Sequence, residues 1–401
     1  MGEREENSSE GRSRFLPFSR PTIGDEEIAE VVECLRSGWI TTGPRVEKFE
    51  GDAAAYTGAT HALALSSGTA ALHAAYWALG IGPGDEVICP SLTWPATANM
   101  AAALGARVVF ADIDRATLQI SPDSVERLIG PRTKAIVPVH FAGAPSDLDR
   151  LRELAGLQRN GRRIAIVEDA AHALGAEYKG KRIGSHGNPT VFSFHPIKAI
   201  TTGEGGLLAA DDADIAARVR RFRFHGVSRD AWRAYGEAAG LHYDTVLPGF
   251  KYNLTDIAAA IGIHQLKKLD GFIARREAID RFYREALSQV AGVEVPREPS
   301  YPHRHARHLF PILVERRDEF VVRLREEKIG AGLHFEPVHR ASFYRQGDYE
   351  GAGRRLPATE EVCARILSLP LFPSMTDGDA ADVVRAVRKV ARALSRPGGR
   401  S

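Results

Sequence analysis

The chain has 401 residues, and its 53 lysines and arginines nearly balance its 51 aspartates and glutamates, which leaves a formal net charge of +2. This length suggests about two domains, and the charge balance leaves no basic stripe of the kind that neutralises a nucleic-acid backbone, so we expect no nucleic-acid partner. The three scattered cysteines, Cys34, Cys89 and Cys363, indicate neither a disulfide framework nor a zinc site, and they fit a reducing cytoplasm.

The N-terminal segment, residues 1–14, is charged and Ser-rich without an apolar core. We therefore expect a disordered tail rather than a signal peptide or an anchor. The uncharged stretch at residues 87–106 has the length of a membrane span, but Pro90, Pro95 and Asn99 favour strand, loop and helix instead. The sequence thus predicts no transmembrane segment and no membrane partner.

Strand-like and helical patterns alternate through the first half of the chain. The expected strands lie at residues 62–65, 87–88, 108–110, 135–139, 164–167 and 191–194. The expected helices lie at residues 70–79, 97–104, 123–129 and 147–155. Such alternation predicts an α/β fold, with a mainly parallel sheet covered by helices on both faces, and we assign residues 15–256 to this large domain.

The pattern changes after residue 256. We expect, in order, a long helix at residues 257–287, a strand at 308–314, a helix at 318–328, a strand at 333–335 and a last helix at 379–394. The last helix should dock through one apolar face, formed by Val383, Val384, Val387, Val390 and Leu394. Residues 257–395 are therefore predicted to form a smaller α+β domain, followed by a tail at 396–401.

Two residues near the middle of the chain suggest a reaction. Asp169 stands where a buried strand ends, and open α/β sheets place ligands at such ends. Lys198 follows an apolar strand and precedes a tight polar turn at residues 201–206, and a partly desolvated lysine is a usable nucleophile and base. Asp169 could instead merely cap the following segment, and most lysines are solvated surface groups.

A phosphate site is predicted where the first strand meets its helix, in Ser66-Ser67-Gly68-Thr69. A helix N-terminus supplies free N–H groups, and Gly68 lets the backbone approach closely, although such a sequence is more often plain capping. An amine, a carboxylate and a phosphate pocket are the three groups that pyridoxal 5′-phosphate (PLP) needs for its Schiff base, its ring nitrogen and its phosphate. We therefore predict PLP as the cofactor.

Nearly the whole chain resembles the sugar aminotransferases of the DegT/DnrJ/EryC1/StrS family, which have the aspartate-aminotransferase fold of type I PLP enzymes. The resemblance is carried by motifs at residues 15–21, 37–44, 91–94, 138–145, 168–173, 192–195, 248–257, 332–335 and 368–373. The sequence looks most similar to enzymes that aminate a UDP-4-keto-pentose to UDP-4-amino-4-deoxy-L-arabinose. One departure is Ala199, where many relatives have Asn after the lysine.

The resemblance implies a role for each of several residues. Lys198 would form the Schiff base and Asp169 would pair with the ring nitrogen of PLP. Trp94 would stack on the ring and His172 would lie near its phenolic oxygen. The phosphate would be held by Thr69, Ala70 and Ser193.

The resemblance also implies contacts beyond the cofactor. Asn253 would reach the phosphate of the neighbouring subunit, so that a homodimer would share its active sites. His334 would contact the substrate. From the residues alone, Trp94 could simply be core and His172 a satisfied buried histidine.

Two further segments leave alternatives open. His303, His305 and His308 invite a metal site, but an irregular basic loop is favoured, so we expect no metal. The segment at residues 226–248 could be a lid or a surface loop, in which Arg229 and Arg233 could meet a diphosphate.

The implied reaction transfers the amino group of L-glutamate to C4 of a nucleotide-linked 4-keto sugar, most simply a UDP-4-keto-pentose, in two ping-pong stages. A 4-keto- or 3-keto-deoxyhexose nucleotide is the alternative substrate. A dehydratase of the same family would have His in place of Lys198, and a non-catalytic regulator would not need the Lys198 and Asp169 pair. The sequence leaves open the nucleotide and the pathway, which could be lipid A modification or antibiotic biosynthesis.

Overall fold

The computed structural model describes residues 12–156, 163–228, 244–346 and 355–395. Its helices are α1 (Asp25–Arg36), α2 (Pro44–Thr57), α3 (Gly68–Ala78), α4 (Ala96–Ala103), α5 (Pro122–Leu128), η1 (Phe141–Gly143), α6 (Leu148–Ala155), α7 (Ala213–Phe222), α8 (Asp256–Leu287), α9 (Arg317–Glu326), η3 (Val338–Arg340), α10 (Ser342–Gln346), α11 (Pro357–Arg365) and α12 (Asp377–Leu394). Its strands are β1 (His61–Leu65), β2 (Glu86–Pro90), β3 (Arg107–Ala111), β4 (Thr133–Ile136), β5 (Ala165–Ile166), β6 (Glu168–Asp169), β7 (Glu177–Tyr178), β8 (Lys181–Arg182), β9 (Thr190–Ser193), β10 (Gly206–Ala210), β11 (Val293–Glu294), β12 (His303–Arg304), β13 (Phe310–Val314) and β14 (Ile366–Leu369).

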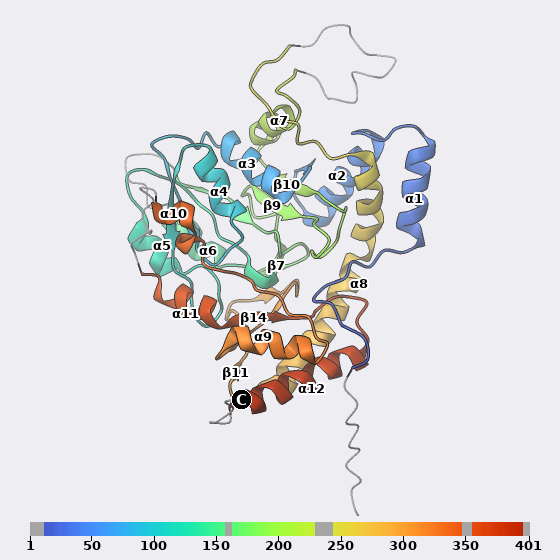
Figure 1. Cartoon of the computed structure of the whole chain (residues 1–401). Coiled ribbons are helices and arrows are strands. Elements are labelled where there is room, and N and C mark those ends of the chain that lie inside the picture. The colour runs from blue at the N-terminus through green and yellow to red at the C-terminus, as the bar shows by residue number, and fades with distance from the viewer. Residues whose placement is uncertain (1–11, 157–162, 229–243, 347–354, 396–401) are drawn as a thin grey trace, which may run out of the picture.

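The central sheet consists of two four-stranded parts, in the orders β1-β10-β9-β6 and β3-β2-β4-β5. Its neighbouring strands β9 and β10 are labelled in Figure 1. Strands β5 and β6 follow each other directly in the chain, so the segment 165–169 joins the two parts. Strand β10 pairs antiparallel with β1 and with β9, whereas the other pairs of this sheet are parallel. The predicted mainly parallel sheet is therefore confirmed, and the carboxyl ends of β1, β6 and β9 lie at one edge.

Helices cover both faces of this sheet. Successive side chains along a strand point to opposite faces, so each strand packs against two helix layers. Val87 and Cys89 of β2 pack with α3, α4 and α7, while Ile88 between them packs with α5 and α6. The side chains of β1 and β10 that face the other way, including Ala64 and Leu207, pack with α2 and the first half of α8. Strands buried on both faces read as continuous apolar runs, which is why the sequence identified them.

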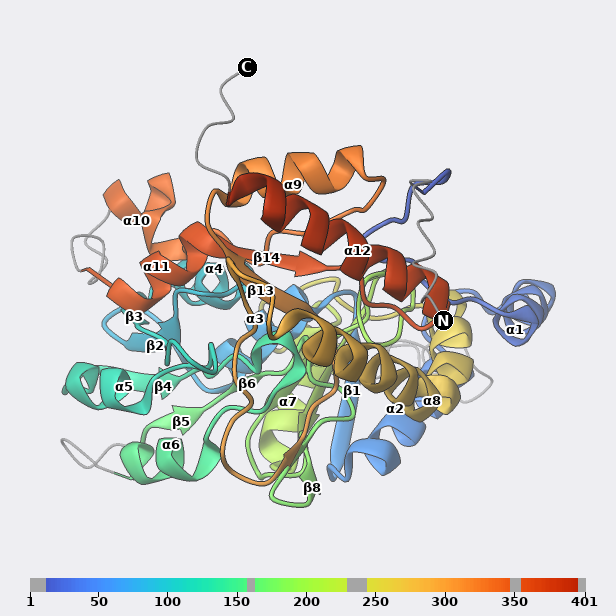
Figure 2. The same ribbon diagram turned by 90° about the horizontal axis from the view of Figure 1, so that it is seen from below.

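The C-terminal part is built around the far end of α8, a single uninterrupted helix of 32 residues (Figure 2). Tyr283 and Leu287 of α8 pack with the sheet β11-β13-β14 and with α9 and α12. The predicted apolar face of α12 is confirmed, since its four valines are buried and Leu394 packs against them. The predicted domain boundary at residues 256/257 coincides with the start of α8 and stays a prediction.

Some expectations need correction or cannot be followed. The predicted strand at residues 333–335 is wrong, because these residues form no strand and only the preceding Gly332 makes an isolated bridge with Ser368. Arg12, inside the predicted tail, pairs with Asp379 at 2.6 Å and with Asp382 of α12. The remaining tail residues, 1–11 and 396–401, and Arg229 and Arg233 lie outside the described residues. Within the described part, no helix is both long and apolar enough to cross a membrane.

Candidate active site

A cavity of about 340 Å³ lies at the sheet edge where β1, β6 and β9 end. Eight of the ten predicted site residues line it: Gly68, Thr69, Trp94, Asp169, His172, Ser193, Lys198 and His334. Five segments that are far apart in the sequence thus meet at one place. This position is the one at which open α/β sheets bind ligands, because loops leave parallel strands there on the same side.

Lys198 provides the amine of this cavity. The surrounding protein desolvates its ammonium group and lowers its pKa to about 8, while the negative charge of Asp169 acts in the opposite direction. The backbone behind the lysine is held by Arg276 of α8, whose guanidinium donates to the carbonyl oxygens of Ala199 at 3.3 Å and of Lys198 at 3.4 Å. About a tenth of Lys198 is therefore unprotonated at pH 7, a far larger share than for an ordinary lysine, and this form is the nucleophile.

Asp169 is held rigidly at the end of β6. It is 5% exposed, and the hydroxyl of Thr97 donates to its Oδ2 at 2.7 Å while the backbone N–H of Ala171 donates to its Oδ1 at 3.2 Å. Thr93 in turn lies 2.8 Å from Thr97, hydroxyl to hydroxyl. Since a carboxylate offers about four acceptor positions, two remain for a ligand. The sequence reasoning missed both threonines, although their spacing of four around Trp94 and the start of α4 was visible.

The N-terminus of α3 and the end of β9 form the phosphate end of the cavity. Ser67 caps the helix and accepts from the backbone N–H of Ala70 at 3.0 Å, and Ala70 itself does not line the cavity. Gly206 of β10 presses against this turn, because a Cβ there would lie 2.4 Å from the carbonyl carbon of Ser67 and 2.5 Å from the nitrogen of Gly68. The close contact shapes a cradle of backbone N–H groups with a positive dipole end, which suits a phosphate.

Two histidines with strongly lowered pKa line the opposite wall. Burial lowers the pKa of His172 well below its usual value, and the nearby charges of Lys198 and His334 add to this effect. Burial, with Lys198, lowers the pKa of His334 to about 4, and its Nδ1 lies 3.0 Å from the hydroxyl of Ser368. Both rings are therefore neutral near pH 7. His308, which the sequence reasoning left in a basic loop, contacts the His172 ring with a centroid distance of 4.4 Å.

Trp94 and Asn253 lie at the margins of this arrangement. Trp94 is 63% exposed and 6.0 Å from the Phe335 ring, so the alternative that it is a core residue is wrong and it stands at the cavity mouth. Asn253 does not line the cavity, and its amide donates to Thr42 Oγ1 at 2.5 Å. Its predicted role concerns a neighbouring subunit and stays a prediction.

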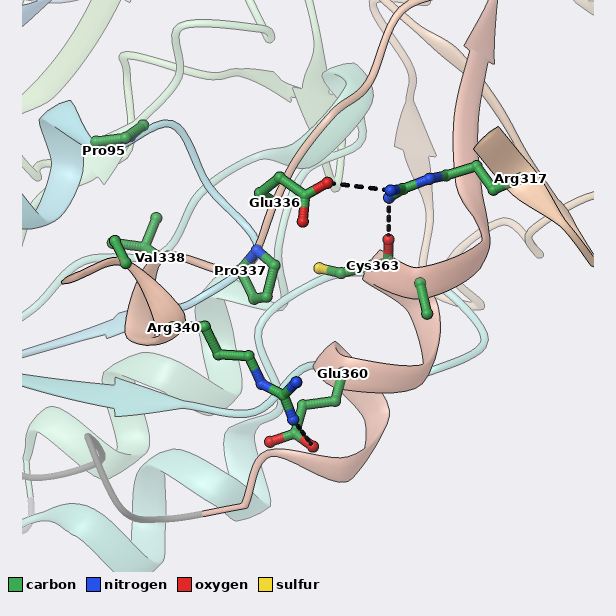
Figure 3. Close-up of a pocket in the computed structure, with 10 residues that line it drawn as sticks. Pro95, Arg317, Glu336, Pro337, Val338, Arg340, Glu360 and Cys363 are labelled. Atoms are coloured by element: carbon green, nitrogen blue, oxygen red, sulfur yellow. Dashed lines mark hydrogen bonds and ion pairs between the residues drawn. The ribbon is translucent and has the colours of Figure 1, made fainter. Parts of the chain in front are cut away.

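A second pocket of about 350 Å³ is lined by Pro95 and by residues of α11 (Figure 3). Its two guanidinium groups are already paired, because Arg317 contacts Glu336 at 3.1 Å and Arg340 contacts Glu360 at 2.6 Å (Figure 3). Binding an anion there would require breaking these pairs. The cavity around Lys198 is therefore the candidate active site.

These residues fit PLP. The cradle at α3 matches a phosphate, the remaining acceptor positions of Asp169 match a protonated ring nitrogen, and the ring of His172 lines the same cavity. Lys198 lines the same cavity, and its desolvated amine would form the Schiff base with the carbonyl group of the cofactor. The geometry supplies all three groups that the sequence predicted.

Comparison with known proteins agrees with this chemistry. Residues 21–388 match the DegT/DnrJ/EryC1/StrS aminotransferase family. The chain is similar to the aminotransferase TlmJ from Streptoalloteichus hindustanus, with 34% identity and a TM-score of 0.86 over 95% of this chain and 100% of that one. It is also similar to Spr1654 from Streptococcus pneumoniae in its PLP form, with 30% identity and a TM-score of 0.87 over 95% and 100% of the two chains.

A third similar structure is Helicobacter pylori PseC, an aminotransferase involved in the biosynthesis of pseudoaminic acid, with 27% identity and a TM-score of 0.86 over 95% of this chain and 100% of that one. These likenesses confirm the predicted type I fold, and the family and the PLP form of Spr1654 confirm the predicted cofactor. The chain therefore belongs to the DegT/DnrJ/EryC1/StrS family and is a PLP-dependent sugar aminotransferase.

Proposed function

We propose that this enzyme transfers the amino group of L-glutamate to C4 of a nucleotide-linked 4-keto sugar, and that the sugar is a UDP-4-keto-pentose. The main support for this proposal is that Lys198 and Asp169 line one cavity, and that the exposed Trp94 lies at the opening of this cavity. The reacting sugar would lie inside this cavity, with the nucleotide extending past the exposed indole. A 4-keto- or 3-keto-deoxyhexose nucleotide is the alternative substrate.

Each residue has a defined task in this proposal. Bound PLP supplies an electrophilic carbonyl and stores the electron pair that the substrate carbon releases. Asp169 holds the proton on the ring nitrogen, and the backbone N–H groups at Gly68 and Thr69 anchor the phosphate. Lys198 removes the α-proton of glutamate in the first stage and delivers a proton to C4 of the sugar in the second. Its pKa of about 8 suits both directions of transfer.

A single-turnover experiment tests the amine-donor stage. Stoichiometric enzyme with PLP is mixed with L-glutamate in the absence of sugar, and the visible absorbance and the 2-oxoglutarate formed are measured. We expect loss of the visible band and one 2-oxoglutarate per site. The matched control, Lys198→Ala, should form 2-oxoglutarate far more slowly than the native enzyme. An enzyme that leaves glutamate unchanged but accepts another amino acid would contradict the proposed donor.

The sugar is tested with the amine-loaded enzyme. Addition of a UDP-4-keto-pentose should restore the PLP absorbance and yield the 4-amino product, and nucleotide-linked 4-keto- and 3-keto-deoxyhexoses serve as competitors. The ratio of kcat/KM values decides between them. A higher value for a deoxyhexose would replace the pentose while keeping the reaction class.

We also infer a cytoplasmic homodimer with shared active sites. Asn253 stands outside its own cavity, and Ile28, Val32 and Leu35 of α1 form an exposed apolar face that a second copy could cover. Mixing Lys198→Ala subunits with Asn253→Asp subunits should restore activity, because one of the two shared sites would be intact. Activity that never rises on mixing, or a fully active monomer in ultracentrifugation, would contradict the shared site.

A further inference from the structure

A junction of three segments lies behind the wall of the active site. The carbonyl oxygen of Ala142 accepts from the backbone N–H of His308 at 2.9 Å, and that of Gly143 accepts from the N–H of Ala306 at 2.9 Å. Gly143 has φ +102°, and a Cβ there would lie 2.9 Å from the carbonyl oxygen of His172. A glycine is needed for these segments to approach so closely. The junction places the ring of His308 against the ring of His172, outside the cavity that His172 lines.

The two imidazole rings touch but make no hydrogen bond to a described residue through their buried nitrogens. Their centroids are 4.4 Å apart with a 44° tilt between the planes. Nδ1 of His172 and both ring nitrogens of His308 are buried without a partner among the described residues. His172 lines the cavity, whereas His308 does not. Since buried polar atoms are almost always hydrogen-bonded, three such atoms side by side need an explanation.

Burial, with the positive charges nearby, keeps both rings neutral. Burial lowers the pKa of His308 well below its usual value, and the neighbouring His172, Lys198, Arg276 and His334 act in the same direction. The pKa of His172 is likewise well below its usual value, first because of burial. A neutral imidazole has one donor and one acceptor nitrogen, so two neutral rings in contact can share one N–H···N hydrogen bond.

We propose that His308 is a positioning residue for His172: its ring N–H donates to Nδ1 of His172, which fixes the tautomer in which Nε2 of His172 carries its proton into the cavity. That proton would then be offered to the phenolic oxygen of PLP. The rings are 4.4 Å apart between centroids and tilted by 44°, so this bond requires them to turn toward a common plane and to separate slightly. The inference rests on the proposed position of His172 beside the cofactor. It pairs two of the three unpaired nitrogens and presents a hydrogen-bond donor to the cavity.

The test uses the PLP-bound enzyme without substrate, with PLP affinity and the pH midpoint of the visible absorbance as readouts. His308→Phe keeps an aromatic ring, somewhat larger than imidazole, and removes the donor, whereas His308→Gln keeps an N–H donor and loses the ring. We expect His308→Phe to weaken PLP binding roughly 5- to 100-fold, because it leaves one buried hydrogen-bonding group, Nδ1 of His172, without its partner. It should also move the absorbance midpoint to higher pH, because the phenolic oxygen loses part of its donor. His308→Gln should stay near the wild type.

A purely space-filling role predicts the reverse order, with His308→Phe like the wild type and His308→Gln perturbed, and this result would overturn the proposal. Thermal denaturation checks that each variant folds, and His308→Leu replaces His308→Phe if the latter does not.

A double-mutant cycle separates the inference from the proposal on which it rests. His172→Phe should shift the absorbance midpoint by itself, and His308→Phe should add no further shift in that background. An unchanged midpoint in His172→Phe would refute the placement of His172 beside the cofactor. If instead His308→Phe shifts the midpoint equally with and without His172, then His308 does not act through His172 and the inference is wrong.

Discussion

Asp169→Asn is the substitution that tests the mechanism most directly, because it removes a charge and keeps the shape. In the native site the carboxylate accepts from the Thr97 hydroxyl at 2.7 Å and from the Ala171 N–H at 3.2 Å. An asparagine oxygen can still accept from Ala171, and its amide can donate to the Thr97 hydroxyl oxygen. The cost to the free energy of unfolding should therefore stay below about 2 kcal/mol, the scale of one altered buried hydrogen bond.

The cost to catalysis should be much larger. A contact ion pair at the effective dielectric constant of a protein site is worth about 4 kcal/mol, and Asp169 would form such a pair with the protonated ring nitrogen of PLP. Asn at position 169 cannot supply that energy. Since about 1.4 kcal/mol corresponds to tenfold in rate, the glutamate half-reaction should slow by about a thousandfold.

The assay is the single-turnover loss of visible absorbance at saturating PLP and glutamate. Thr97→Val is the matched control, since it leaves the charge of Asp169 and removes one hydrogen bond to it, so its loss in rate should be clearly smaller. Saturating PLP separates a slow reaction from poor binding. A half-reaction of Asp169→Asn within tenfold of the wild type would show that the carboxylate does not support the cofactor as argued.

Four other outcomes follow from the same geometry. Capture of PLP by the apoenzyme should speed up as pH rises to about 8 and then level off, because the free amine of Lys198 forms with a pKa of about 8; a rate in stopped-flow absorbance that still climbs at pH 10 would indicate an ordinary lysine. Gly206→Ala should lower the free energy of unfolding by about 1–3 kcal/mol and weaken PLP binding in titrations, since its Cβ would lie 2.4 Å from the carbonyl carbon of Ser67. Leu324→Ala, in the core between α9 and α12, should cost about 2–5 kcal/mol in denaturant unfolding but leave the PLP affinity unchanged. The pKa of His334 is lowered to about 4 from 6.5, so its neutral ring favours folding above pH 6.5 and this contribution is lost as pH falls toward 4; His334→Gln should flatten that part of a melting-temperature profile, and an unchanged slope would contradict it.

Much of the fold was predictable because its elements have strong local signals. The buried strands read as short apolar runs and α12 shows its valines on one face, so their positions followed from periodicity. The strand predicted at residues 333–335 failed because Leu333 and Phe335 are apolar for another reason. They line the active-site cavity rather than a sheet.

The sequence by itself indicated the family and the cofactor, and it predicted Lys198 and Asp169 as the reactive groups. Lys198 and Asp169 follow apolar strands, and parallel strands bring their carboxyl ends to one edge, so their meeting could be anticipated from local pattern. PLP chemistry needs an amine and a carboxylate in one site, and these two residues supply them.

Only the tertiary structure decided the environment of these groups. The hydroxyl of Thr97 on Asp169, the guanidinium of Arg276 behind Lys198 and the ring of His308 against His172 all come from distant segments. Close packing at Gly143, beside His172, and at Gly206, beside the turn before α3, also depends on the tertiary structure, because a Cβ at either position would collide with another segment. Burial and charge at such contacts set the pKa of an amine or an imidazole, and neither quantity exists until the chain has folded.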